Sequence, residues 1–128
     1  MKIGEVSEKY EISPDTLRYY ERIGLLPSVH RTDSGIREFS ELDLRRVSFI
    51  KCMRSAGLPI EVLIAYFKLV QQGDETMDAR KEILIEQREQ LLARMKELQE
   101  TLDLLEYKIE VYENALLKSE QALHLIED

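Results

Sequence analysis

After Gly73 the chain contains no residue that would end a helix. All five glycines and all three prolines lie at or before this position. Beyond it, apolar residues recur in alternating steps of four and three over more than three heptads, which is the pattern of a coiled-coil seam. The predicted seam consists of Leu91, Met95, Leu98, Leu102, Leu105, Ile109, Tyr112 and Leu116. We therefore predict that residues 76–128 form one long helix and a C-terminal tail.

The seam of this helix needs a partner. A helix over residues 78–117 would be roughly 60 Å long, and the rest of the chain is too small to cover its apolar face. A second copy of the chain is the simplest partner, so we expect a homodimer joined through residues 76–128. The seam by itself does not decide whether the two helices run parallel or antiparallel.

Charge is distributed unevenly between the two parts. Residues 1–75 contain 11 Lys and Arg against 12 Asp and Glu, whereas residues 76–128 contain 7 against 13. The net charge of −7 therefore lies mostly in the C-terminal part. If the nearly neutral N-terminal part binds phosphates, its basic residues must lie together on one face.

Several classes of protein are disfavoured by composition. No segment has the ~18 consecutive apolar residues that a membrane span needs, and residues 1–5 do not resemble a signal peptide. The single cysteine cannot form an internal disulfide, and His30 and His124 stand alone, so we expect no metal site and no cofactor. Carboxylate pairs, a catalytic triad and a phosphate-binding loop are not found at useful spacing. We expect a cytoplasmic protein that is not an enzyme.

The first 73 residues predict short helices separated by turns. Ile3, Val6 and Tyr10 recur at helical spacing and indicate a first helix. Ser13 followed by Pro14 is a typical helix start, so a second helix should extend from about Pro14 to Ile23 and end at a glycine. These two helices, at about residues 3–23, form a predicted helix-turn-helix.

A hairpin and a second helix pair follow. Residues 28–39 are polar around a turn at Asp33-Ser34-Gly35, which predicts a β-hairpin wing. A capping box at residues 40–43 should start a third helix that ends near Gly57, and Leu58-Pro59 should start a fourth. We therefore expect a helix pair over residues 40–72. The fold class is mainly α, with a winged helix-turn-helix head and a long C-terminal helix.

The second helix and the wing carry the candidate nucleic-acid contacts. Leu17, Tyr20 and Ile23 share one face of this helix, and polar side chains occupy the others. Arginine pairs with guanine or phosphate, and hydroxyl groups reach phosphates. By itself this helix is better explained as an ordinary amphipathic helix with a solvated face, but the arginine-bearing hairpin that follows favours DNA. The candidate contacts are Thr16, Arg18, Tyr19, Arg22, Arg31 and Arg37, whereas Tyr20 and Phe39 should support the fold.

These motifs closely resemble those of the MerR family of bacterial transcription regulators. The resemblance covers about residues 2–70 and implies a DNA-binding domain at residues 1–70, an antiparallel coiled-coil dimer, and activation by untwisting a promoter whose spacer is over-long. RNA polymerase would be an indirect partner at that promoter. Glu11 departs from the pattern, since relatives often have glycine in this turn. The matching segments are Ile3-Gly4-Glu5-Val6, Thr16-Leu17-Arg18-Tyr19-Tyr20-Glu21, Gly24-Leu25-Leu26-Pro27, Arg31, Gly35-Ile36-Arg37-Glu38-Phe39 and Gly57-Leu58-Pro59.

Cys52 has two interpretations. A lone cysteine is usually a small buried hydrophobe, but cations such as Lys51 and Arg54 beside a thiol favour its reactive thiolate form. Residues 49–57 resemble the aldehyde- and thiol-stress-responsive (AdhR/NmlR-like) branch of the family. That resemblance implies that Cys52 is the sensing residue, activated by alkylation or nitrosylation.

Two other functions remain open. One is a MerR-like regulator with a different small-molecule effector and a structural Cys52. Metal sensing is disfavoured, because metal-sensing relatives carry cysteines at the start of the dimer helix, where residues 76–79 have none. The other is a coiled-coil scaffold whose head binds protein. Binding that weakens steeply with salt would indicate a DNA reader instead.

Overall fold

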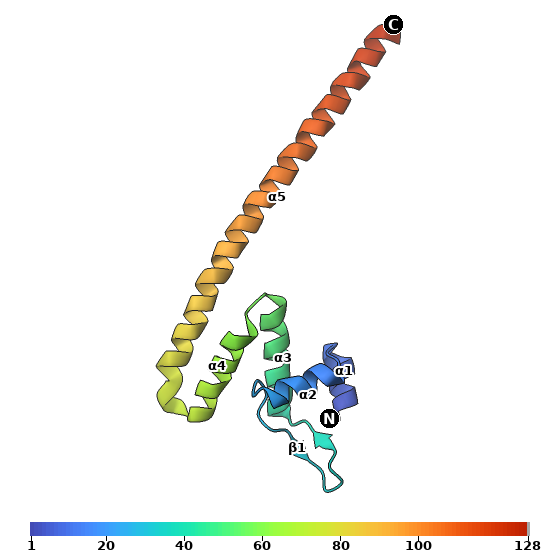
Figure 1. The fold of residues 1–128 in the computed structure, drawn as a ribbon. Helices are drawn as coiled ribbons and strands as arrows, with labels where there is room; N and C mark the ends of the chain where they lie inside the picture. Colours follow the sequence, from blue (N-terminus) through green and yellow to red (C-terminus); the bar gives the residue numbers. More distant parts are fainter. Residues whose placement is uncertain (128) are drawn as a thin grey trace. The chain divides into compact units, whose positions relative to one another are not determined.

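The computed structural model describes residues 1–127, and side chains through Gln121. Contacts divide the chain into two compact units, with the boundary between Gln87 and Arg88. The predicted mainly helical class, with a winged helix-turn-helix and a long C-terminal helix, is confirmed (Figure 1). The elements are α1 (Ile3–Tyr10), α2 (Pro14–Arg22), β1 (His30–Arg31), β2 (Arg37–Glu38), α3 (Glu41–Ser55), α4 (Ile60–Gln72), the 3-10 helix η1 (Asp74–Thr76) and α5 (Met77–Glu127).

Helix α2 begins and ends as its sequence predicts. The Ser13 hydroxyl oxygen accepts the backbone N–H of Thr16 at 3.1 Å, and Pro14 occupies the first helical position. Gly24 follows the helix at φ +83°, a conformation that glycine adopts without a steric penalty. The backbone N–H groups of Leu25 and Leu26 then donate to Tyr20 O at 2.9 and 3.0 Å. This ending turns the chain from α2 toward the wing.

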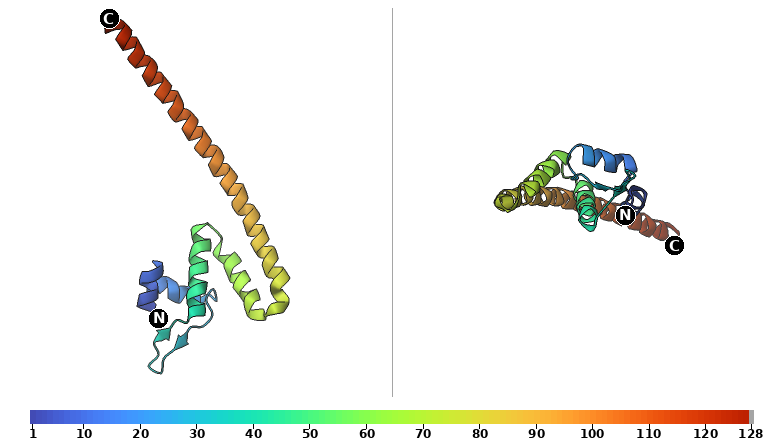
Figure 2. Two further views of the ribbon diagram at one scale, coloured as in Figure 1. Left: turned by 180° about the vertical axis from the view of Figure 1, so that it is seen from behind. Right: turned by 90° about the horizontal axis from the view of Figure 1, so that it is seen from below.

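The predicted wing is a short antiparallel hairpin. β1 pairs with β2 so that His30 lies opposite Glu38 and Arg31 opposite Arg37. The turn between them is closed by Thr32, whose N–H donates to Ile36 O and whose carbonyl accepts from Gly35 N, both at 2.8 Å. The hairpin projects away from the helices of the head (Figures 1 and 2). Its strands are only two residues each, so other contacts must hold it in place.

Helices α3 and α4 differ slightly from the predicted boundaries. The predicted capping box is present, since Ser40 Oγ accepts from Asp43 N and Asp43 accepts from Ser40 N. α3 ends at Ser55, two residues before Gly57, near which its end was predicted. Gly57 has a φ of +91° and already lies in the turn. α4 begins after Pro59, whose ψ of 143° is extended.

One apolar core joins these elements. α1 packs against both α2 and α3. The aromatic rings of Phe49, Tyr66 and Phe67 extend the core between α3 and α4, with centroids 5.4–5.9 Å apart. Phe39 is buried and Tyr20 is packed against the core, as predicted. The buried apolar residues are Val6, Leu17, Leu25, Leu26, Val29, Phe39, Val47, Ile50, Leu58, Leu63 and Phe67.

The last helix, α5, is longer than predicted. It continues to Glu127 and leaves no tail after residue 117 within the described chain, because nothing in that segment breaks a helix. From Arg88 onward its predicted seam is exposed at every position except the partly buried Leu91. The assignment of residues 1–70 to DNA binding and 76–128 to dimerisation stays a prediction.

Glu11 has a left-handed backbone, and its replacement by glycine should stabilise the head. Its φ of 55° is the only positive value among the described non-glycine residues. A side chain in this conformation costs about 1 kcal/mol, whereas glycine adopts it freely. We expect Glu11→Gly to raise the free energy of unfolding by roughly 0.5 kcal/mol, after the greater chain entropy of glycine is counted. Urea denaturation followed by circular dichroism would measure it.

The control for this prediction is Glu11→Gln. It removes the exposed ion pair with Lys51, whose N···O distance is 3.7 Å, but keeps the side chain that causes the strain. This variant should leave the free energy of unfolding nearly unchanged. Equal stabilisation by both substitutions would show that charge, not backbone conformation, is responsible.

Candidate nucleic-acid interface

A hollow of about 490 Å³ lies between α2 and the wing. Arg18 and Arg22 reach it from the helix, and Arg31 and Arg37 from the hairpin. Glu21, Ser28 and Val29 complete its lining. The structure therefore brings together four of the six predicted contact residues from segments separated in sequence. Four guanidinium groups facing one concave surface form a site for anions.

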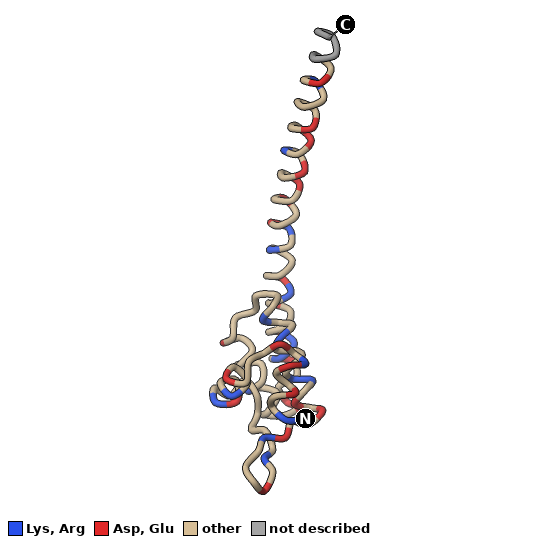
Figure 3. The backbone as a smooth tube through the Cα atoms, turned by 90° about the vertical axis from the view of Figure 1, so that its right-hand side faces the viewer, with Lys and Arg blue, Asp and Glu red and all other residues tan. Residues whose placement is uncertain are grey.

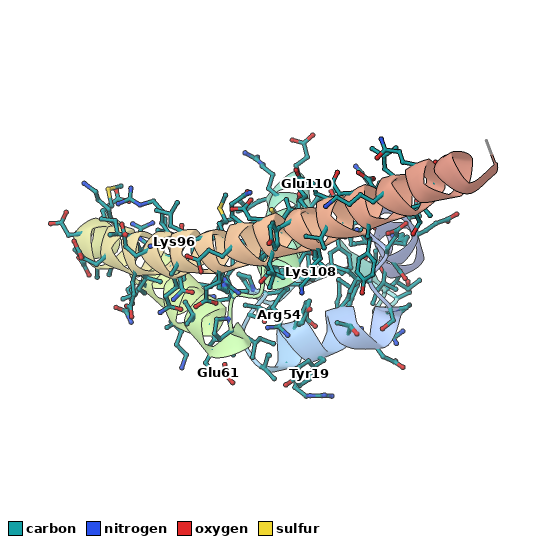
Figure 4. All side chains as sticks on the ribbon, turned by 90° about the horizontal axis from the view of Figure 1, so that it is seen from above. Tyr19, Arg54, Glu61, Lys96, Lys108 and Glu110 are labelled. Atoms are coloured by element: carbon teal, nitrogen blue, oxygen red, sulfur yellow. The ribbon has the colours of Figure 1, made fainter. Side chains whose placement is uncertain are left out.

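The side chains of α2 are arranged along its exposed face. Arg18 Nη1 donates to Asp15 Oδ1 at 2.9 Å, in an ion pair that is open to solvent. Tyr19 is 41 % exposed, and the Arg22 guanidinium carbon lies 5.4 Å from the centre of its ring. Figure 4 marks Tyr19 on this helix. An arginine held over an exposed tyrosine presents both a cation and a hydroxyl to a partner.

Thr16 has a local role in α2. Its hydroxyl oxygen accepts from Ser13 Oγ at 2.8 Å, and its N–H is capped by the same Ser13 oxygen. The hydroxyl is partly exposed at the first turn of the helix. Thr16 therefore stabilises the start of α2, and it does not line the hollow.

Arg31 and Arg37 occupy opposite strands of the wing but have different environments. Arg31 is exposed, and its Nη1 donates to the Gly35 carbonyl at 3.0 Å. Arg37 is only 18 % exposed and is paired with Glu21, which is 16 % exposed. The pairing gives Arg37 a structural contact that its position in the sequence did not indicate.

Glu21 is the residue in this region to which the sequence assigned no function. Its Oε1 accepts from Arg37 Nε at 3.1 Å and lies 3.0 Å from Arg37 Nη2, while its Oε2 accepts from Val29 N at 2.7 Å. These partners are 16 and 8 residues away along the chain. Helical periodicity indicates only that Glu21 is polar, so no sequence signal identifies its partners.

A second set of contacts ties the base of the wing to residues 1–2. The Met1 amino group donates to Phe39 O at 3.1 Å, and Phe39 N donates to Met1 O at 2.7 Å. Glu38 forms an ion pair with Lys2. The hydrogen bond from Lys2, with the charges of Lys2 and the amino group, lowers the pKa of the Glu38 carboxyl. At pH values above the ordinary pKa of a glutamate, the ion pair between Glu38 and Lys2 therefore stabilises the wing. This stabilisation is lost when Glu38 is protonated at lower pH.

Cys52 lies on α3, away from the hollow, and its side chain is exposed. The neighbouring cations have other partners: Lys51 is 3.7 Å from Glu11 Oε2, and Arg54 Nη1 donates to Leu58 O at 2.9 Å. The interpretation of Cys52 as a small buried hydrophobe is wrong for this chain, because its α3 position faces outward rather than toward Val47 and Ile50 of the core.

The basic residues lie largely in the first unit and the early turns of α5. In Figure 3 blue and red segments alternate over the head, whereas red segments prevail toward the end of α5. The second unit is therefore poorly suited to phosphates, and we expect any nucleic-acid surface to lie in the first.

Comparison with known protein families decides the class of this head. The model of the MerR HTH family regulatory proteins matches residues 1–69, and a second model, described as MerR, DNA binding, matches residues 44–107. The chain belongs to the MerR family. It is a DNA-binding transcription regulator of that family, with the helix-turn-helix and wing described above.

Among curated MerR relatives, the HTH-type transcriptional regulator AdhR of Bacillus subtilis is 51 % identical over 92 residues. That match spans 72 % of this chain and 66 % of AdhR, which is slightly less than two thirds of the relative's length. An uncharacterised HTH-type regulator of Haemophilus influenzae is 34 % identical, and the match spans 94 % of this chain and 90 % of that regulator.

Solved MerR structures share the fold. A protein of Listeria monocytogenes assigned to the family has 47 % identity and a TM-score of 0.91, and the match covers 96 % of this chain and 93 % of that protein. HiNmlR, described as a family regulator that lacks the sensor domain and is bound to promoter DNA, has 33 % identity and a TM-score of 0.80, covering 89 % and 90 %. The resemblance to the AdhR/NmlR-like branch is therefore confirmed.

Among the described residues, no cluster of three or more His, Cys, Asp or Glu side chains is arranged to hold a metal ion. No helix described here combines the length and apolar character needed to cross a membrane.

Proposed function

We propose that this MerR-family regulator binds promoter DNA as a homodimer and activates transcription in response to reactive aldehydes or thiol stress. The basic hollow between α2 and the wing is the observation that carries the DNA-binding part of the proposal. α2 would enter the major groove while the wing contacts the neighbouring backbone. The proposed contacts are Thr16, Arg18, Tyr19, Arg22, Arg31 and Arg37.

Electrostatics gives this proposal a quantitative signature. Each arginine that neutralises a phosphate releases counterions, so the logarithm of the binding constant should fall with the logarithm of salt concentration by about 0.9 per contact. Arg18, Arg22 and Arg31 are exposed and available for such contacts. A scaffold whose head binds protein would show a much shallower dependence.

The exposed α5 seam supports the dimer. HiNmlR, whose fold this chain shares, was solved on promoter DNA. Two heads joined through antiparallel α5 helices would bind the two halves of a palindrome. Untwisting or kinking an over-long spacer costs several kcal/mol, which contacts to the DNA backbone must offset. The deformation would bring both promoter elements into register for RNA polymerase.

Cys52 is the proposed sensing residue. The similarity to AdhR and the exposed thiol support this assignment. The thiolate would add to the carbonyl carbon of an aldehyde, and the former carbonyl oxygen would take a proton to give a hemithioacetal. The alternative, a different effector with a structural Cys52, is less well supported because this side chain is not part of the core.

Replacement of Cys52 should separate sensing from DNA binding. We expect Cys52→Ala to bind DNA with unchanged affinity, because the residue lies away from the basic hollow. Induction of a reporter by formaldehyde or methylglyoxal should be lost. Cys52→Ser is the matched control for shape, and it should also be unresponsive because a hydroxyl is a far weaker nucleophile. Retained induction in either variant would overturn the assignment.

Footprinting on the DNA around the protein's own gene tests the whole proposal. The expected result is protection of a palindrome between two promoter elements with an over-long spacer. Formaldehyde should then create a hypersensitive site at its centre in the wild type but not in Cys52→Ala. A footprint that does not change with aldehyde would contradict the proposed inducer but would still support the function as a DNA-binding regulator. If no footprint forms on this DNA and the protein also selects no binding site from genomic DNA, the scaffold function would be favoured.

A further inference from the structure

We infer that Glu21 is a positioning residue that fixes the wing to the recognition helix α2, so that both contact DNA in one register. The inference rests on the proposed DNA-binding surface and concerns a residue that has no contact role in it. We call Glu21, Arg37 and the backbone N–H of Val29 the wing clamp.

The wing clamp holds both strands of the hairpin to α2. Val29 immediately precedes β1, and its N–H donates to Glu21 Oε2 at 2.7 Å. Arg37 begins β2, and its Nε donates to Glu21 Oε1 at 3.1 Å, with Nη2 at 3.0 Å from the same oxygen. One carboxylate on α2 therefore contacts the entry and the return of the wing. Both of its oxygens are used, and charge-assisted bonds of this kind are strong.

The hairpin needs such a contact because its own pairing is weak and contains a charge conflict. Its two-residue strands place Arg31 directly opposite Arg37. Like charges at opposed positions destabilise a strand pair. Glu21 compensates the charge of Arg37 and leaves Arg31 exposed. The guanidinium donors on Arg37 Nη1 do not take part in the wing clamp, so they remain for a phosphate.

Glu21→Gln distinguishes positioning from simple electrostatics by the sign of its effect. Removing a negative charge from a surface that faces phosphates should by itself strengthen DNA binding. Val29 and Arg37 donate to different oxygens of Glu21, and a glutamine amide has an acceptor oxygen at only one of these two positions and a donor nitrogen at the other, so one of the two contacts is lost. If the wing clamp positions the hairpin, the same substitution should weaken binding despite the favourable change in charge.

The experiment uses the full chain and the duplex that the wild type selects from a random-sequence pool. We expect Glu21→Gln to bind this duplex roughly tenfold more weakly, which is the loss of about one charge-assisted hydrogen bond. By nuclear magnetic resonance, the Val29 amide of the free variant should exchange faster with solvent. The matched control is Asp33→Asn, which removes the same charge from the exposed wing turn. It should bind equally or more tightly, with unchanged Val29 exchange.

Two further variants test the coupling. Arg37→Lys keeps the charge but replaces a planar guanidinium with a single ammonium, so it should resemble Glu21→Gln. The double variant should bind no more weakly than the weaker single one. Three results would each overturn the inference. The affinity losses of Glu21→Gln and Arg37→Lys would multiply in the double variant, Glu21→Gln would bind as tightly as Asp33→Asn, or Val29 exchange would be unchanged in Glu21→Gln. If the wild type selects no duplex, the proposed function fails, whereas faster exchange in Glu21→Gln would still support the wing clamp.

Discussion

Placing glutamate at two seam positions, Leu98→Glu with Leu105→Glu, should convert the regulator to a monomer. Both side chains are more than half exposed in the single chain. In a coiled coil both would be buried, where an unpaired carboxylate is strongly unfavourable. We expect analytical ultracentrifugation to give the monomer mass at concentrations where the wild type is a dimer.

The same variant should lose most of its affinity for a full palindrome. Joining two heads makes the second half-site contact intramolecular, which strengthens binding about a hundredfold or more. Affinity for a duplex with one half-site should change little, and this measurement shows that the heads remain folded. Leu104→Glu with Val111→Glu is the control, since it introduces the same two charges beside the seam at positions that face away from the partner. A variant that remains dimeric would disprove the predicted seam.

Leu17→Ala should be the most destabilising single substitution on α2. Leu17 is 1 % exposed and packs beneath the candidate DNA-binding face. Truncation removes buried apolar atoms and leaves a cavity, so we expect the free energy of unfolding to fall by about 3 kcal/mol. Urea denaturation at one fixed protein concentration would measure the loss, because the stability of a dimer depends on concentration.

Tyr19→Ala is the comparison for this prediction. Tyr19 follows Leu17 on the same helix but is 41 % exposed. Its removal should cost less than about 1 kcal/mol of stability, while affinity for DNA falls. Equal stability losses for the two variants would show that α2 is not held to the head through its Leu17 face.

Much of the fold was predictable because its determinants act over a few residues. The cap at Ser13, the turn at Gly35 and the capping box at Ser40 all depend on neighbours within four positions, and the structure contains each of them. The extent of α5 was underestimated. The last seam residue, Leu116, indicates where a partner stops packing, and it does not indicate where the helix ends.

The candidate contact residues were predicted from helix periodicity and the hairpin turn, but their arrangement was not. The hollow requires Arg18 and Arg37 to meet across 19 positions of sequence, and the exposure of Cys52 depends on which face of α3 the other helices cover. Such relations arise only when distant segments pack together.

The sequence alone therefore determined the local elements, the family resemblance and the apolar seam, since short-range hydrogen bonds and side-chain periodicity specify them. Only the tertiary structure decided that Glu21 holds the wing. Its three contacts involve Val29 and Arg37, which no local pattern connects to it. A carboxylate on a helix surface acquires a specific partner only when chain folding brings a donor within hydrogen-bond distance and removes water from both.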